Sequence, residues 1–163
     1  MPKRDHGKLA VSWWPSNPTT GPNGTAATWV GIEFGVEVPG RLAGFRAYIN
    51  SGEDGNSEAK IWIPGIATNL QVVQFGIRAT SGNQWHQAWF RPWVRLSTTE
   101  TYRFAMIFPH GKFWRTNNAL TSAVRHGNIT FNKGFQTTSL TPELATISLV
   151  ANANAVDILY YED

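Results

Sequence analysis

The chain has 163 residues, which is enough for one domain with a sizeable core. It contains no cysteine, so disulfide bonds and thiolate chemistry are excluded. Only 15% of the residues are charged, against about 25% in an average soluble domain. A surface with so little charge leads us to expect that neighbouring subunits cover part of it.

The net charge is +3, and the basic residues are dispersed along the chain. Because binding along a phosphate backbone needs a clustered basic face, we expect no nucleic-acid partner. No apolar run has the length of a signal peptide or of a membrane-spanning segment. The sequence therefore predicts a protein made in a cytoplasm, with no membrane partner.

Residues 1–28 are expected to form an N-terminal arm. Turn-forming residues without periodicity dominate 15–25. The adjacent Trp13 and Trp14 are interpreted as an aromatic anchor that docks on a partner or on the protein's own sheet. Residues 29–163 are expected to form a single β-sandwich domain.

From residue 29 onward the apolar residues alternate with other residues, as they do in half-buried strands. Alternation predicts strands over 29–38 and 41–49, with a turn at Pro39 and Gly40 between them. Two further strands are expected over 59–63 and 70–80. The apolar positions of each strand share one face, which indicates a sheet with one buried side.

The segment 85–96 carries tryptophans at every fourth position, a spacing that suits one stripe of a helix or one face of a strand. A helix would hold Pro92 in its interior, at a cost of about 3 kcal/mol. We therefore expect a strand from Trp85 to Arg91, an interruption at Pro92, and a continuation from Trp93 to Leu96. A proline at this place predicts an edge strand or a bulge.

Alternation continues over 101–108, and the longest irregular segment follows at 109–128. Loops of that length are more often functional than accidental. Short strands are expected at 129–131 and 134–139, and closing strands at 144–150 and 155–163. This pattern predicts an all-β fold, a two-sheet antiparallel jelly-roll-like β-sandwich with an extended N-terminal arm.

The order of these segments resembles the family known as domain of unknown function 4082, a β-sandwich module of bacterial surface proteins. Residues 29–56, 84–108 and 155–163 carry the resemblance, which extends over about 25–163. The stretch 53–62 departs from the family pattern, which has a Gly-Thr-His type of segment there. The resemblance implies a non-catalytic sandwich similar to carbohydrate-binding modules. Such modules also resemble domains in minor tail proteins of phages that infect actinobacteria.

Candidate metal ligands are few. His110 and His126 flank the long irregular segment, but their spacing matches no standard zinc site, and we predict no metal there. The acidic residues Glu53, Asp54 and Glu58 either form a solvated turn or hold calcium with the help of carbonyl groups.

Catalytic patterns are equally scarce. Glu33 and Glu37 are too isolated to indicate the carboxylate pair of a glycosidase, and no Gly-x-Ser-x-Gly nucleophile elbow occurs. We therefore predict that the protein is not an enzyme, has no catalytic residues and needs no cofactor.

The eight tryptophans exceed what a core of this size requires. Trp29, Trp62 and Trp85 lie in alternating apolar strands and are expected in the core. Trp89 and Trp93, near the edge that Pro92 predicts, belong either to the core or to an interface with another subunit.

Trp114 is the best candidate for ligand binding, because an exposed indole face stacks on sugar rings. It lies in the long irregular segment beside Arg115 and Asn117, whose side chains bond hydroxyl groups, and near His110.

Two functions are compatible with these observations. The first is a non-catalytic structural protein of a phage virion, a minor tail or capsid-surface decoration component that forms a homo-oligomer and contacts other virion subunits. The second is a free carbohydrate-binding module or lectin. A host-surface glycan is a further expected partner in either case.

Overall fold

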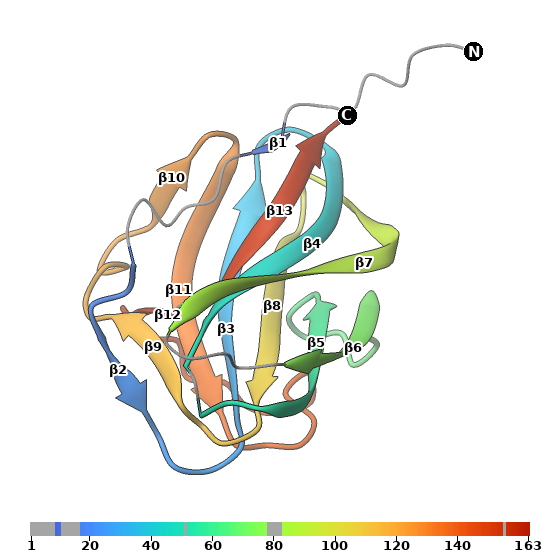
Figure 1. The fold of residues 1–163 in the computed structure, drawn as a ribbon. Helices are drawn as coiled ribbons and strands as arrows, with labels where there is room; N and C mark the ends of the chain where they lie inside the picture. Colours follow the sequence, from blue (N-terminus) through green and yellow to red (C-terminus); the bar gives the residue numbers. More distant parts are fainter. Residues whose placement is uncertain (1–8, 11–16, 51, 78–82, 155) are drawn as a thin grey trace.

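A computed structural model of the chain describes all residues except 1–8, 11–16, 51, 78–82 and 155. The described residues contain no helix, and none of them forms a helical segment able to cross a membrane. Two antiparallel sheets pack face to face, as Figure 1 shows. The predicted β-sandwich is therefore confirmed.

The first sheet, here sheet A, holds seven of the described strands. Its main path runs β1 (Leu9–Ala10), β13 (Val156–Glu162), β4 (Gly40–Ile49) and β7 (Gln84–Leu96). Three short strands extend it beyond the end of β4: β9 (Phe113–Thr116), β2 (Thr20–Asn23) and β12 (Ala153–Asn154).

The second sheet, sheet B, holds six of the described strands. Their order is β10 (Val124–His126), β11 (Ile129–Thr137), β3 (Thr28–Val36), β8 (Thr101–Phe108), β5 (Gly55–Trp62) and β6 (Gln71–Ile77). Strand β8 has the bounds that alternation predicts.

The orders β1-β13-β4-β7 and β3-β8-β5-β6 are those of an eight-stranded jelly roll, to which β11 is added beside β3. The short strand β1 takes the place of the first jelly-roll strand because it pairs with β13, with Leu9 opposite Tyr161. Strand β2 pairs with β9 in the same sheet. Part of the predicted arm thus contributes strands to sheet A.

The main core lies between the sheets and follows from the period of two along each strand. Phe45 of β4 stands at its centre, with ring centroids 4.9 Å from Phe104, 5.7 Å from Phe90 and 5.3 Å from Phe75. Burying one such side chain contributes about 1.5–3 kcal/mol. The rings come from four strands of both sheets, so they hold the sandwich together.

A second hydrophobic cluster lies on the outer face of sheet B. It contains Trp29, Trp62, Ala105 and Phe135, all buried, with Ile147 packed against them. Trp29 and Trp62 are therefore buried as predicted, although outside the space between the sheets. The expected strand over 144–150 is wrong.

Only Val150 of that segment bridges to a strand residue, Gly134. The alternating apolar residues of this stretch predict a strand, but they belong to an irregular segment, 138–149, that lies across sheet B and is here called the cover segment. Gly134 permits the close approach, because a Cβ there would come within 2.1 Å of the Asn152 carbonyl oxygen.

A buried ion pair ties this cover to sheet B. The Lys60 Nζ lies 3.1 Å from both carboxylate oxygens of Glu143 and 5.1 Å from the centre of the Trp29 ring. Asn69 donates a further hydrogen bond of 3.0 Å to the same carboxylate. Burial tends to raise the pKa of Glu143, but hydrogen bonds from its own backbone, Asn69 and Lys60 outweigh burial and lower this pKa.

Pro92 predicts an edge strand or a bulge, and β7 shows both. Within the described residues it pairs with β4 alone, and its register shifts between the pairs Leu42–Val94 and Gly44–Trp89. The strand continues through Pro92, however, so the predicted interruption is wrong. A bulge at an edge accommodates the missing proline N–H without ending the strand.

Trp85 corrects another expectation. It is half-buried on the outer face of sheet A and packs against the main core without being one of its buried residues. Its ring packs against Tyr48 at 5.4 Å, and the Arg46 guanidinium lies 4.4 Å from its centre. Its Nε1 donates to Asn17 Oδ1 at 3.2 Å. The two faces of β7 were correctly predicted, but the face that carries Phe90 points into the core, and the face that carries Trp85 points outward.

Candidate functional site

Two of the predicted ligand residues, Trp114 and Arg115, lie on strand β9. The segment 109–128 is therefore not irregular throughout, since it also contains β10. Phe113 is buried and faces the core, so the strand directs Trp114 and Arg115 to opposite sides. Asn117 is exposed just beyond the strand end. The structure thus separates Trp114 and Arg115, which we had expected to act together.

The Trp114 ring is half-buried between β2 and β4. It meets Tyr48 edge-on, with centroids 5.9 Å apart and an interplanar angle of 88°. On another side it packs on Gly21, where a Cβ would stand 2.8 Å from the ring. The indole Nε1 is buried and has no hydrogen-bond partner among the described residues. These contacts cover part of the Trp114 ring, and the rest of the side chain stays accessible.

Arg115 lines an open groove of about 430 Å³ at one end of the sandwich. The groove lies between the sheets, because β2 and β9 of sheet A form one wall and β3 and β11 of sheet B the other. Its polar lining consists of Asn23, Thr28, Arg115, Gln136, Thr137 and Thr138. Its size falls in the range of small-molecule sites.

Among the described residues the Arg115 guanidinium has no ionic partner, and its Nε is buried without a hydrogen-bond acceptor. Across the groove, Gln136 and Thr138 are exposed. Asn23 donates its amide hydrogens to the carbonyl oxygens of Thr20 and Phe113, at 3.1 and 3.3 Å. The groove therefore combines one cation with amide and hydroxyl groups.

The fourth predicted ligand residue, His110, lies elsewhere. It is exposed in the turn between β8 and β9, and its Nε2 is 3.0 Å from the Asp54 carbonyl oxygen. The His110 side chain is not among the residues that line the Arg115 groove.

The same turn is held by Glu53, whose side chain is fully buried. One of its carboxylate oxygens accepts the backbone N–H of His110 at 3.0 Å, and the other accepts that of Lys112 at 2.5 Å. These charge-assisted bonds fix the turn that leads into β9. The sequence showed Glu53 only as part of an acidic loop, because its buried partners are backbone groups.

The acidic residues considered for calcium do not converge. Glu53 is bonded to backbone N–H groups, whereas Glu58 on β5 accepts from Gln74 and lies 3.6 Å from Lys60 Nζ. Over the described residues, no group of three His, Cys, Asp or Glu side chains is arranged to hold a metal ion. Glu33 and Glu37 pair separately with Arg103 and Arg125.

The predicted interface residues on β7 are accessible. Trp89 and Trp93 are 41% and 40% exposed on the outer face of sheet A. Trp93 stacks on Tyr161 of β13, with centroids 5.2 Å apart and planes within 10°. The other two predicted interface residues, Trp13 and Trp14, lie outside the described residues.

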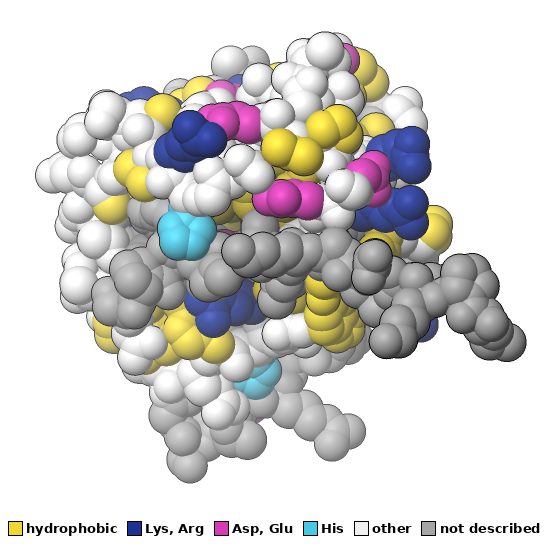
Figure 2. Space-filling view, turned by 90° about the horizontal axis from the view of Figure 1, so that it is seen from above, with side chains coloured by type: hydrophobic (Ala, Val, Ile, Leu, Met, Phe, Trp, Pro, Cys, Tyr) yellow, Lys and Arg dark blue, Asp and Glu magenta, His cyan; other side chains and the backbone are white. Residues whose placement is uncertain are grey.

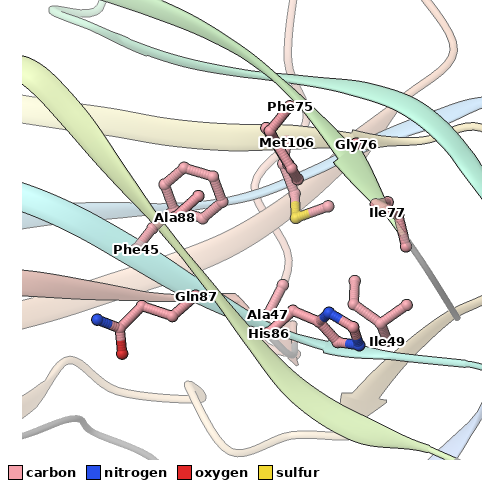
Figure 3. A pocket seen from close by; sticks show the side chains of 10 residues that line it. All are labelled: Phe45, Ala47, Ile49, Phe75, Gly76, Ile77, His86, Gln87, Ala88 and Met106. Carbon is pink, nitrogen blue, oxygen red and sulfur yellow. The ribbon is translucent and has the colours of Figure 1, made fainter. Parts of the chain in front are cut away.

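A small apolar pocket of about 50 Å³ opens between β6 and β7, at the edge where the two sheets meet. Figure 3 shows His86 near Ile49 and Ile77 at one end of this pocket, with Met106 and Phe75 further along it. The His86 Nε2 is buried without a hydrogen-bond partner, and burial lowers the pKa of the imidazole. The pocket is too small for a ligand of several rings.

Charges of both signs alternate on the surface. Figure 2, a view from above Figure 1, shows basic side chains beside acidic ones on that face. Ion pairs join Arg41 to Asp163, at 3.3 Å, and Arg46 to Asp157, at 3.2 Å. Such pairing differs from the continuous basic stripe of nucleic-acid-binding proteins.

The fold and the groove define a jelly-roll β-sandwich with a polar opening at one end. A family model described as "Domain of unknown function (DUF4082)" matches residues 14–149, so the chain belongs to this family. The family predicted from the strand pattern is therefore confirmed. No curated protein matches the chain.

Proposed function

We propose that this protein is a non-catalytic structural component of a phage virion, a minor tail or capsid-surface decoration subunit that forms a homo-oligomer through the outer face of β7. The observation that carries the proposal is the exposure of two tryptophans, Trp89 and Trp93, on an edge strand. Monomeric proteins more often protect such edges.

The composition of this face supports a protein interface. Tryptophan, tyrosine and arginine are the residues most enriched at the centres of interfaces. Arg91 lies between the two tryptophans in the sequence, Arg95 follows Trp93, and both arginines are exposed. The stacking on Tyr161 restrains Trp93 before any partner binds, so less side-chain entropy is lost on association.

The virion setting rests on the resemblance to domains of actinobacteriophage minor tail proteins, and the low charge of the chain supports an assembled protein. In this proposal the protein is made in the host cytoplasm and becomes part of the particle. Contacts with other virion subunits would involve surfaces other than the self-association face on β7.

Light scattering over a range of concentrations tests the assembly. We expect a discrete oligomer, which the double substitution Trp89→Ala and Trp93→Ala converts to a monomer. The matched control is Leu140→Ala, since Leu140 is 83% exposed on the cover segment. A monomer at every concentration, or equal loss of the oligomer in the control, would contradict the proposal.

A free carbohydrate-binding module or lectin is the second candidate, and the groove at Arg115 favours it. A lectin of this kind would bind glycans as a monomer. The same light-scattering series, combined with a glycan array, distinguishes the two functions.

A further inference from the structure

Three arginines of the described residues are half-buried, and they differ in their partners. The Arg46 Nε lies 3.2 Å from an Asp157 carboxylate oxygen, and the Arg103 Nε lies 3.0 Å from that of Glu33. Arg115 has no carboxylate partner in the part of the chain that the structure describes, and its Nε is buried there without an acceptor. A partly desolvated charge without a counter-ion is unfavourable, so this arginine is the exception to be explained.

The surroundings of Arg115 indicate which chemical group would pair with its guanidinium. The side chain lines the open groove, so a ligand in the groove would meet the guanidinium. Because Nε is buried, we expect a ligand to contact the two terminal nitrogens of Arg115. A carboxylate matches two such donors well, because both are planar and form paired hydrogen bonds.

The other lining residues narrow the ligand class. Gln136 and Thr138 present exposed amide and hydroxyl groups, and Asn23 adds an amide on the opposite wall. Phe113, the one aromatic residue among the described residues that line the groove, is only 2% exposed. Recognition would therefore depend on hydrogen bonds and charge, not on ring stacking.

Competing ligands fit less well. A nucleic acid would require several cations along a track, but Arg115 is the only charged residue among the described residues that line the groove. An apolar ligand would leave the cation and the polar walls without partners. A hydroxyl-rich molecule that carries a carboxylate satisfies both parts of the lining.

We propose that the groove between β2, β9, β3 and β11 binds an acidic saccharide, with Arg115 contacting its carboxylate and Asn23, Gln136 and Thr138 contacting its hydroxyl groups. This site is independent of the assembly face on β7, since the two share no residue.

A glycan array that pairs carboxylate-bearing saccharides with their neutral counterparts tests the ligand class. We expect acidic members to bind and their neutral counterparts to bind at least about tenfold more weakly. Equal binding of both, or no binding by any acidic member, would overturn the proposal. Calorimetry with the best acidic saccharide then supplies the affinity.

Substitutions identify the site. Arg115→Gln should weaken binding by about thirtyfold or more, because it removes the charged partner. Arg125→Gln is the matched control, since Arg125 is exposed on β10, which pairs with the opposite end of β11. Equal losses in both variants would contradict the placement of the site.

A second variant tests the same groove if Arg115→Gln fails to fold. Gln136→Ala together with Thr138→Ala changes only exposed side chains and should weaken binding about fivefold or more through lost hydrogen bonds. Competition with inorganic phosphate tests whether the groove recognises the saccharide or any small anion. Displacement of the saccharide by phosphate at equal concentration would indicate a simple anion site and overturn the saccharide assignment.

Discussion

Replacing Glu53 with glutamine tests how the turn between β8 and β9 is held. The carboxylate accepts one backbone N–H from His110 and one from Lys112, with no exposure to solvent. Glutamine keeps the shape of the side chain but offers one acceptor oxygen and one NH₂ group. Whichever way the amide is turned, its NH₂ must face a backbone N–H, so one of the two hydrogen bonds is lost.

The size of the effect follows from these two bonds. A hydrogen bond to a charged group contributes about 1.5–3 kcal/mol, and a neutral one about 0.5–1.5 kcal/mol. Losing one charged bond and weakening the other gives a destabilisation of about 2–3 kcal/mol, after allowing for relief of the buried charge. In a domain of this size, that lowers Tm by about 4–12 °C.

Thermal unfolding and urea titration of Glu53→Gln measure this loss. Glu100→Gln is the control, because Glu100 is exposed, and it should change stability by less than about 0.5 kcal/mol. A Glu53→Gln protein within about 0.5 kcal/mol of the wild type would refute the role given to this carboxylate.

Three further perturbations probe the packing. His86→Leu should raise stability more at about pH 5 than at about pH 8, because the lowered pKa of His86 makes the wild type lose stability as pH falls below 6.5. Gln87→Leu, which changes an exposed neighbour that does not titrate, should give the same change in thermal scans at both pH values. Phe135→Ala should lower the free energy of unfolding, measured by urea titration, by about 3–5 kcal/mol. It should also speed proteolysis of the cover segment 138–149, which packs on this side chain's cluster. An unchanged cleavage rate would count against the role of the second cluster. Gly21→Ala should destabilise the fold by about 1–3 kcal/mol, because the new methyl group displaces the Trp114 ring. The displaced ring should shift the tryptophan emission to longer wavelength, and unchanged emission would contradict that contact.

Much of the fold was predictable because strand patterns are local. The alternation in 101–108 fixes which residues face inward, and β8 follows it. The same reasoning failed for 144–150, whose alternation is real but serves packing against sheet B. Periodicity reports which side chains are buried, and it does not report whether the backbone finds a strand to pair with.

The candidate site was less predictable, because its groove is assembled from four separate strands. The sequence indicated Arg115 through its neighbour Trp114, whereas the structure places the two on opposite sides of β9. Gln136 and Thr138 gave no signal, since amide and hydroxyl residues are common in strands and turns. Glu53 was visible only as an acidic residue, because backbone partners leave no trace in the sequence.

The two proposed surfaces assign separate tasks to separate parts of one sandwich. The outer face of β7 offers exposed aromatic side chains suited to a protein partner, and the groove at Arg115 offers a cation among hydrogen-bonding groups suited to a sugar acid. Because they share no residue, Trp89→Ala with Trp93→Ala should remove the oligomer and leave saccharide affinity per site unchanged. Arg115→Gln should do the reverse. If either variant removed both properties, the oligomer interface itself would have to complete the saccharide site.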